Sequence, residues 1–210
     1  MSISEYPLEP ELISHIYNRA NGNEKLYLNE NHYYEFMYKY TKYIEPIVDT
    51  YAYCLLPNHF HFMVKIKSEE EIISFFKKQN PMFSLPEGQG LSGSLSRQFG
   101  RLFSSYTQWF NGKIDRKGSL FIPNFKRKPV EDPHYFTQLV AYIHTNPIKH
   151  GLTDDLHKWT FSSYHAYTSL KKSKVNTNII LDFFGSRDEL EKFHKNYNEY
   201  LMDLKGLELE

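Results

Sequence analysis

A turn followed by an alternating strand, within Leu56–Val64, constrains the fold of this chain more than any other stretch. It opens with a Pro-Asn dipeptide, which is turn chemistry, and continues as an apolar run of strand length. Successive side chains of a strand point to opposite faces of a sheet, so His59 and His61 are predicted to lie side by side on one face. The run over residues 47–56 also reads as a strand, and the tight turn predicts that the two strands pair antiparallel.

Two imidazoles on one face of a strand can chelate a divalent cation, because histidine is the commonest protein ligand for metals. The His59 and His61 pair is therefore a candidate metal site. The alternative is a pair of half-exposed strand histidines without a ligand. The spacing alone leaves both readings open, since the chain has 10 histidines.

The remaining elements follow from periodicity and from turn and capping residues. Strands are expected at residues 12–19 and 125–130, and helices at residues 31–43, 68–80, 95–110, 132–147 and 186–204, with a loop over 81–94. The order strand–helix–strand–strand–helix…strand predicts a ferredoxin-like α+β sandwich, with an antiparallel sheet and helices packed on one face. Residues 171–210 are predicted to form a C-terminal helical extension of unknown role, beyond a domain spanning 1–170.

Composition limits the classes of protein to be considered. The 210 residues predict one domain, and 25 basic against 25 acidic side chains give no global excess that would favour nucleic acid. The single cysteine, Cys54, excludes a disulfide framework within the chain. No apolar stretch has membrane-span length, and Met1–Pro7 lacks the features of a signal peptide, so we expect a cytoplasmic protein without membrane contact.

Basic side chains cluster locally, with eight of them and a single acid between residues 97 and 128. Such a segregated basic segment in a neutral protein is typical of a surface that binds a phosphate backbone. A solvated helix face and loop is the alternative. The residues predicted to contact DNA are Arg97, Arg101, Arg116, Lys117, Lys126, Arg127 and Lys128.

The predicted helix over 132–147 has a polar side as well as a buried stripe. Tyr142 and Asn146 are four residues apart and therefore share one face of that helix. A phenol and an amide oxygen so placed can point at the same ion or phosphate. Mg²⁺ and Mn²⁺ accept amide oxygens and imidazoles. The role of Tyr142 stays open on this ground alone, because the chain has sixteen other tyrosines.

The combination resembles a known family. His59-Phe60-His61 after Leu56-Pro57-Asn58 resembles the His-hydrophobic-His (HUH) motif of single-tyrosine transposases. The stretches Gly118–Phe121, Tyr142–Leu152 and Trp159–Tyr164 resemble the REP-associated branch of that family. The resemblance covers roughly residues 10–170, and its motifs are specific because they occur together in the expected order.

The resemblance implies a mechanism. Tyr142 would attack a phosphodiester of single-stranded DNA, forming a 5′-phosphotyrosine bond and releasing a 3′-hydroxyl. His59, His61 and Asn146 would hold Mg²⁺ or Mn²⁺. The partner would be single-stranded DNA carrying a hairpin. The oligomeric state is left open, with a homodimer as one alternative. The base that accepts the phenol proton is not identified, with His144 as one candidate.

Two other functions remain open at this stage. One is a hairpin- or single-strand-binding protein of the same fold that has lost catalysis. The other is a small metal hydrolase in which the His pair activates water. The hydrolase would need a general base and usually a carboxylate ligand, and no acidic residue lies near His59 in the sequence.

Overall fold

A computed structural model describes residues 6–88, 90–169 and 173–203. Residues 1–5, which belong to the Met1–Pro7 stretch that argues against a signal peptide, lie outside these ranges. Residue 204, the predicted end of the last helix, lies outside them too. The elements are β1 (Ile13–Arg19), α1 (Glu30–Tyr43), β2 (Val48–Leu56), β3 (His59–Ile66), α2 (Glu69–Gln79), α3 (Gly90–Ile114), β4 (Lys126–Pro129), α4 (Pro133–Lys149), the 3₁₀ turn η1 (Leu156–Lys158), α5 (Tyr164–Thr168), α6 (Thr177–Phe184) and α7 (Arg187–Asp203).

The four strands form one antiparallel sheet with the order β2-β3-β1-β4. This order places the two strands joined by the tight turn, β2 and β3, side by side as expected. Together with the seven α-helices in the described part of the chain, this sheet confirms the predicted α+β class. The bounds of β3 are those read from the sequence.

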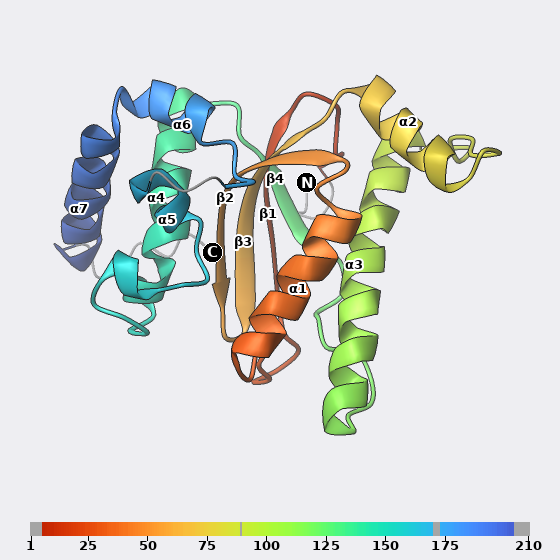
Figure 1. Cartoon of the computed structure of the whole chain (residues 1–210), viewed down its shortest axis with the longest axis horizontal. Helices are drawn as coiled ribbons and strands as arrows, with labels where there is room; N and C mark the ends of the chain where they lie inside the picture. The colour runs from red at the N-terminus through yellow and green to blue at the C-terminus, as the bar shows by residue number, and fades with distance from the viewer. Residues whose placement is uncertain (1–5, 89, 170–172, 204–210) are drawn as a thin grey trace.

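Helices cover both faces of the sheet, whereas the sequence predicted one face. In Figure 1, α1 and α3 lie on one side, and α4 and α7 lie on the other. We call these the α1/α3 face and the α4 face. The prediction was wrong on this point because helix periodicity identifies a buried stripe without identifying the sheet face that buries it.

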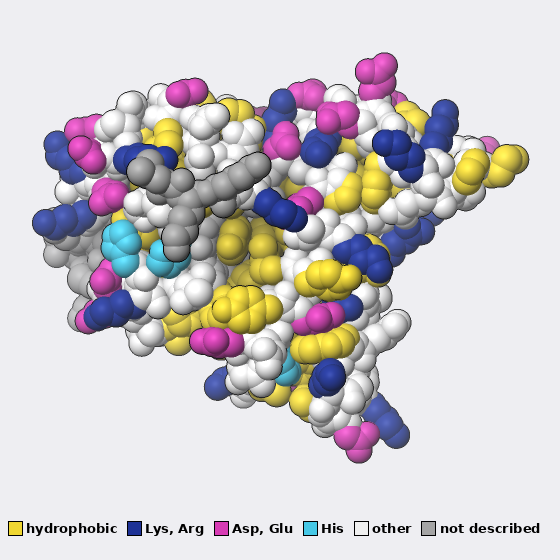
Figure 2. Space-filling view, in the orientation of Figure 1, with side chains coloured by type: hydrophobic (Ala, Val, Ile, Leu, Met, Phe, Trp, Pro, Cys, Tyr) yellow, Lys and Arg dark blue, Asp and Glu magenta, His cyan; other side chains and the backbone are white. Residues whose placement is uncertain are grey.

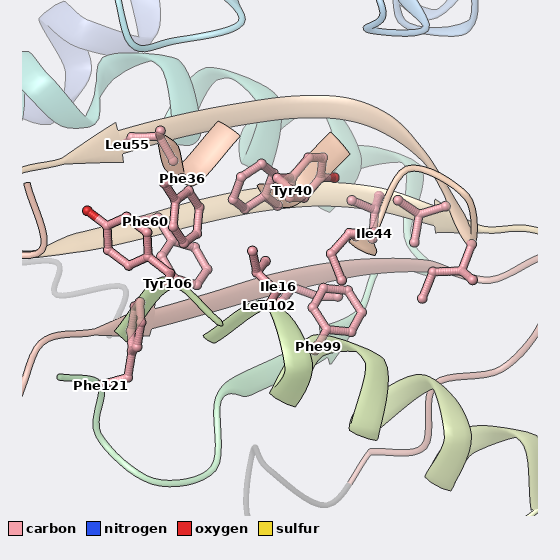
Figure 3. Close-up of a cluster of buried hydrophobic side chains, with 14 of the residues drawn as sticks. Ile16, Phe36, Tyr40, Ile44, Leu55, Phe60, Phe99, Leu102, Tyr106 and Phe121 are labelled. Carbon is pink, nitrogen blue, oxygen red and sulfur yellow. The ribbon is translucent and has the colours of Figure 1, made fainter. Parts of the chain in front are cut away.

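The α1/α3 face holds a core rich in aromatic rings (Figure 3). Tyr40 of α1 stacks on Phe62 of β3 with ring centroids 4.3 Å apart. The buried Tyr106 hydroxyl of α3 donates to the Leu26 carbonyl at 2.6 Å, so its polar tip is satisfied. Burying each such side chain stabilises the fold by about 1.5–3 kcal/mol.

The start of the helix predicted over residues 68–80 is confirmed. Ser68 and Glu71 form a complete capping box at the start of α2. Helix α3 begins at Gly90, several residues before its apolar stripe, within a segment predicted to be a loop. A tertiary contact holds this polar first turn, since the Leu8 N–H donates to Ser92 Oγ at 2.9 Å.

A distant segment covers the β2 edge of the sheet at Tyr53–Leu55. The Leu55 N–H donates to the Phe161 carbonyl and the Ser163 N–H donates to the Tyr53 carbonyl, both at 2.9 Å. An isolated bridge between Cys54 and Ser162 lies between these bonds. At the opposite edge, β4 has four residues and ends at Pro129.

The C-terminal helices α6 and α7 pack with α4 in a second apolar cluster that includes Ile180 and Leu190. No helix among the described residues is long and apolar enough to cross a membrane. Figure 2 shows acidic and basic side chains mixed over the visible surface.

Candidate active site

Strand β3 separates two kinds of side chain by alternation. Phe60 and Phe62 enter the core of the α1/α3 face, and His59 and His61 point to the α4 face. The two imidazoles lie with ring centroids 5.3 Å apart. The predicted placement of the histidine pair on one face is therefore found in the structure.

Helix α4 lies across that face and carries the predicted tyrosine and amide. Asp132 caps its N-terminus by accepting from the Tyr135 N–H, and Pro133 occupies the first turn. The Tyr142 ring stands edge-on to His61, with centroids 5.4 Å apart. Tyr142 is 8% exposed, so its ring is packed between the helix and the sheet.

Asn146 lies one turn after Tyr142 and is fully buried. Its Nδ2 donates to the Tyr142 carbonyl at 3.1 Å, which fixes the plane of the carboxamide. Its Oδ1 has no hydrogen bond of normal geometry among the described residues, yet the carboxamide is close enough to His59 to favour the protonated imidazole. The four residues predicted for catalysis and metal binding thus meet at one place.

Hydrogen bonds occupy one ring nitrogen of each β3 histidine. His59 Nδ1 lies 2.7 Å from Asn58 Oδ1, and because that oxygen only accepts, Nδ1 carries the proton. His61 Nδ1 lies 3.0 Å from Nε2 of His15, a residue of β1. In both residues the opposite nitrogen, Nε2, remains outside these bonds.

Burial and neighbouring charge keep both imidazoles neutral. Desolvation, followed by His150, lowers the pKa of His59 to about 4, although Asn146 acts in the opposite direction. The pKa of His61 is lowered well below its usual value. Desolvation is the largest cause, and the others are the charges of His15, His59, His150 and Lys149. Neutral imidazole is the form that binds a metal ion.

The predicted basic residues of β4 divide between the two faces. Lys126 pairs with Tyr17 and Lys128 with His15, so both lysines emerge on the α4 face. Arg127 points to the other face and donates to Ser96 Oγ of α3 at 2.6 Å. The Lys128 ammonium lies 4.3 Å from the centre of the Tyr135 ring.

The other predicted DNA contacts lie away from the histidine pair. Arg97 and Arg101 are exposed on α3, which packs on the α1/α3 face. Arg116 donates to Glu24 and to the carbonyls of Gly118 and Ser119, so it fastens a loop. Lys117 is exposed beside it. The contiguous basic segment is therefore distributed over several surfaces.

Several residues near the site were not singled out from the sequence. His15 and Tyr17 stack with ring centroids 4.7 Å apart and face His61. Lys149 places its ammonium 5.5 Å from the centre of the Tyr142 ring, and the His150 ring lies 4.9 Å from that of His59. The spacing of Lys149, seven residues after Tyr142, could have indicated it because seven residues make nearly two helical turns.

His144 does not lie open to the site. His194 Nδ1–H donates to the Leu190 carbonyl at 2.7 Å, so its Nε2 accepts from His144 Nδ1 at 2.8 Å. His144 Nε2 lies 2.7 Å from Ser163 Oγ. Both nitrogens of this buried ring are thereby engaged, which argues against His144 as the base for the tyrosine.

Among the described residues, no group of three or more His, Cys, Asp or Glu side chains is arranged to hold a metal ion. A metal site here would need a ligand outside those four residue types. The side-chain oxygen of Asn146, which lies beside His59, is a donor of that other type.

Comparisons with known proteins agree with the family resemblance. No family model matches the chain. A curated Haemophilus influenzae protein, provisionally named a REP-associated tyrosine transposase, is 26% identical over 121 residues. That match covers 56% of this chain and 59% of the relative, so the chain spans less than two thirds of the relative's length.

A solved structure has a similar fold. It is described as the REP-associated tyrosine transposase bound to a REP hairpin, and it superposes with a TM-score of 0.55 at 16% sequence identity. The likeness covers 83% of this chain and 93% of that one. The similarity to the REP-associated branch, first read from short motifs, is therefore confirmed by a relative in sequence and by a solved fold.

Proposed function

We propose that this chain cleaves and rejoins single-stranded DNA through a covalent bond to Tyr142. One observation carries the proposal: the Tyr142 ring packs against His61 at 5.4 Å, with Asn146 one turn away beside His59. The curated relative named as a tyrosine transposase supports the assignment of the tyrosine as nucleophile.

The reaction is a transesterification at phosphorus. A bond forms between Tyr142 Oη and the phosphorus, while the bond from phosphorus to the 3′-oxygen breaks. The phenol gives up its proton, and the 3′-oxygen takes one up to leave as a hydroxyl. Attack by a 3′-hydroxyl on the phosphotyrosine reverses the step, so the bond energy is kept and no nucleotide cofactor is consumed.

The side chains fit a divalent cation. His59 and His61 each keep Nε2 outside the hydrogen bonds described above, and the buried Asn146 Oδ1 lacks a partner of normal geometry. These three residues would hold Mg²⁺ or Mn²⁺, which would stabilise negative charge on the phosphoryl oxygens. The chain itself orients the phenol by packing it against His61.

The proposed substrate is a single strand with an adjacent hairpin. The phosphodiester has to reach Tyr142, whose ring packs between α4 and β3, and a flexible strand can bend to do so. A B-form duplex has a persistence length of about 150 base pairs, so bending it into this space carries a deformation cost. The similar solved structure with its REP hairpin supports the hairpin part of the proposal.

The test is a covalent-adduct assay. An oligonucleotide with a hairpin and a single-stranded flank, labelled at its 3′ end, is incubated with protein and Mn²⁺ and separated under denaturing conditions. We expect a labelled protein band with the wild type and with Tyr135→Phe, a matched control from the same helix. Tyr142→Phe should give no band while binding the DNA within a few fold.

The outcomes separate the alternatives. Binding without cleavage in the wild type would indicate a hairpin-binding protein without catalysis. Cleavage without a covalent band, retained in Tyr142→Phe and equally fast on blunt duplex, would indicate a metal hydrolase. Adduct formation by Tyr142→Phe at the wild-type level would move the nucleophile to another residue.

A further inference from the structure

The proposed chemistry makes no use of His15, although this histidine bonds directly to the site. It lies on β1, is 7% exposed, and places Nε2 3.0 Å from Nδ1 of His61. We propose that His15 is a positioning residue that holds His61 in the tautomer able to bind metal. This inference rests on the metal site of the proposed function.

The argument begins with the ring protons. A neutral imidazole carries one proton, on either Nδ1 or Nε2, and only the other nitrogen has a lone pair for a metal. If His15 Nε2 donated to His61, the single proton of His61 would sit on Nε2 and block that nitrogen. If His61 Nδ1 donates to His15, then His61 Nε2 keeps its lone pair. The direction of one hydrogen bond therefore decides whether His61 can be a ligand.

His59 indicates which direction of the His15–His61 hydrogen bond allows His59 and His61 to bind one metal ion together. The Asn58 oxygen only accepts, so His59 has its proton on Nδ1 and its lone pair on Nε2. A site formed by both histidines requires the same tautomer in His61. His15 then acts as the acceptor for His61 as Asn58 does for His59.

His15 is held in position by packing. Its ring stacks on Tyr17 at 4.7 Å between centroids and lies edge-on to Tyr142 at 6.4 Å. The β1–β3 register pairs Tyr17 with His61. It thereby brings His15, which precedes His61 by 46 positions in the sequence, beside the site. Since His15 Nε2 faces His61 Nδ1, that nitrogen is engaged by the hydrogen bond and is not itself a metal ligand.

Two substitutions separate the acceptor from the bulk of the side chain. His15→Gln keeps an oxygen that can accept from His61, and His15→Leu removes it. Ser14→Ala, on the same strand and facing the other side of the sheet, is the control for disturbance of β1. The Mn²⁺ dissociation constant of each folded protein is measured without DNA by electron paramagnetic resonance of the free ion.

We expect His15→Leu to weaken Mn²⁺ binding roughly 10- to 100-fold, the usual range for loss of an outer hydrogen-bond partner. His15→Gln should restore most of the affinity, and Ser14→Ala should match the wild type. Wild-type affinity in His15→Leu would overturn the proposal. Absence of Mn²⁺ binding in the wild type would instead contradict the metal site of the proposed function.

A second readout addresses the tautomer directly and needs no metal. Long-range ¹H–¹⁵N spectra of metal-free protein identify which nitrogen of each histidine carries the proton. We expect the His61 proton on Nδ1 in the wild type and in His15→Gln, with a shift toward Nε2 in His15→Leu. A proton on Nε2 of His61 in the wild type would overturn the inference even if the variants failed to fold.

Discussion

The two faces of the sheet differ in what they bury. The α1/α3 face packs rings and aliphatic side chains against one another, as Tyr40 does on Phe62. Of the five histidines that are buried in the described part of the chain, four lie on the α4 face: His15, His61, His144 and His194. The fifth, His32, lies on α1 against Trp109 and Phe110.

The difference indicates a division of tasks between alternate residues of the same strands. Apolar burial on one face stabilises the fold, which allows the other face to hold polar rings at a cost in desolvation. The polar rings are satisfied by hydrogen bonds to one another and to distant elements. Mutations of neighbouring residues on the two faces should therefore affect stability and chemistry in different proportions.

The sharpest test compares two adjacent residues of β3. His61→Ala should abolish covalent-adduct formation, a loss of at least about 10³-fold, and lower the free energy of unfolding by about 1–3 kcal/mol because His15 loses its partner. Phe62→Ala should lower the unfolding free energy by about 3–5 kcal/mol. Urea denaturation and the adduct assay measure both quantities.

A milder variant on the core side provides the control. Phe62→Leu should remain folded and form adducts near the wild-type rate. If this variant lost adduct formation as completely as His61→Ala does, the proposed division of stability and chemistry between the two faces of the sheet would be contradicted.

The second test uses acid. Burial is the main cause that lowers the pKa of His194 to about 4 and that of His144 well below its usual value. The unfolded chain binds protons below about pH 6.5, while the folded histidines stay neutral to much lower pH. Their contribution is therefore fully present above pH 6.5, and it is lost as pH falls toward 4, by about 1.4 kcal/mol per unit for each residue.

The measurement is urea unfolding at pH 7 and pH 5. His194→Gln should reduce the difference between the two pH values by about 2 kcal/mol, and the exposed His134→Gln serves as control. An unchanged pH dependence in His194→Gln would show that His194 is not a source of the acid sensitivity.

The third test compares cations on the two faces. If about four cations engage phosphates, single-strand affinity should fall roughly 50-fold between 50 and 200 mM salt. When Lys126 and Lys128 are both replaced by Ala, the affinity should fall only roughly 7-fold over the same salt range, because two phosphate contacts disappear. Replacing Arg97 and Arg101 should leave the salt dependence of a linear single strand unchanged.

Filter binding across a salt series gives these slopes. A flat response in the wild type would mean that the basic segment is only a solvated surface. If replacing Arg97 and Arg101 changed the salt dependence more than replacing Lys126 and Lys128, the single strand would bind on α3 instead of on the α4 face.

Local patterns in the sequence predicted the four strands, the longer helices and the central residues of the site, but not the short elements η1, α5 and α6. Period-two alternation placed His59 and His61 on one face, and the helix predicted over residues 132–147 begins where Asp132 caps α4. The four-residue spacing of Tyr142 and Asn146 placed them on one side of the helix. These features depend only on residues close together in the chain, which is why they could be predicted.

Long-range pairing could not be predicted in the same way. The position of His15 beside His61 depends on the register of β1 against β3. The basic segment appeared continuous in sequence, but the alternation of β4 turns Arg127 away from Lys126 and Lys128. The choice of sheet face by α4 likewise depends on tertiary packing with β2 and α7.

The closed β2 edge has a consequence for behaviour at high concentration. Unpaired N–H and C=O groups at a sheet edge act as a template on which another molecule can add a strand. Here the segment around Ser162 occupies the β2 edge, and the lysines and Pro129 of the short β4 interrupt the other. We therefore expect both edges to resist the addition of a strand from another molecule, and at Tyr53–Leu55 this depends on the seam formed by residues 161–163.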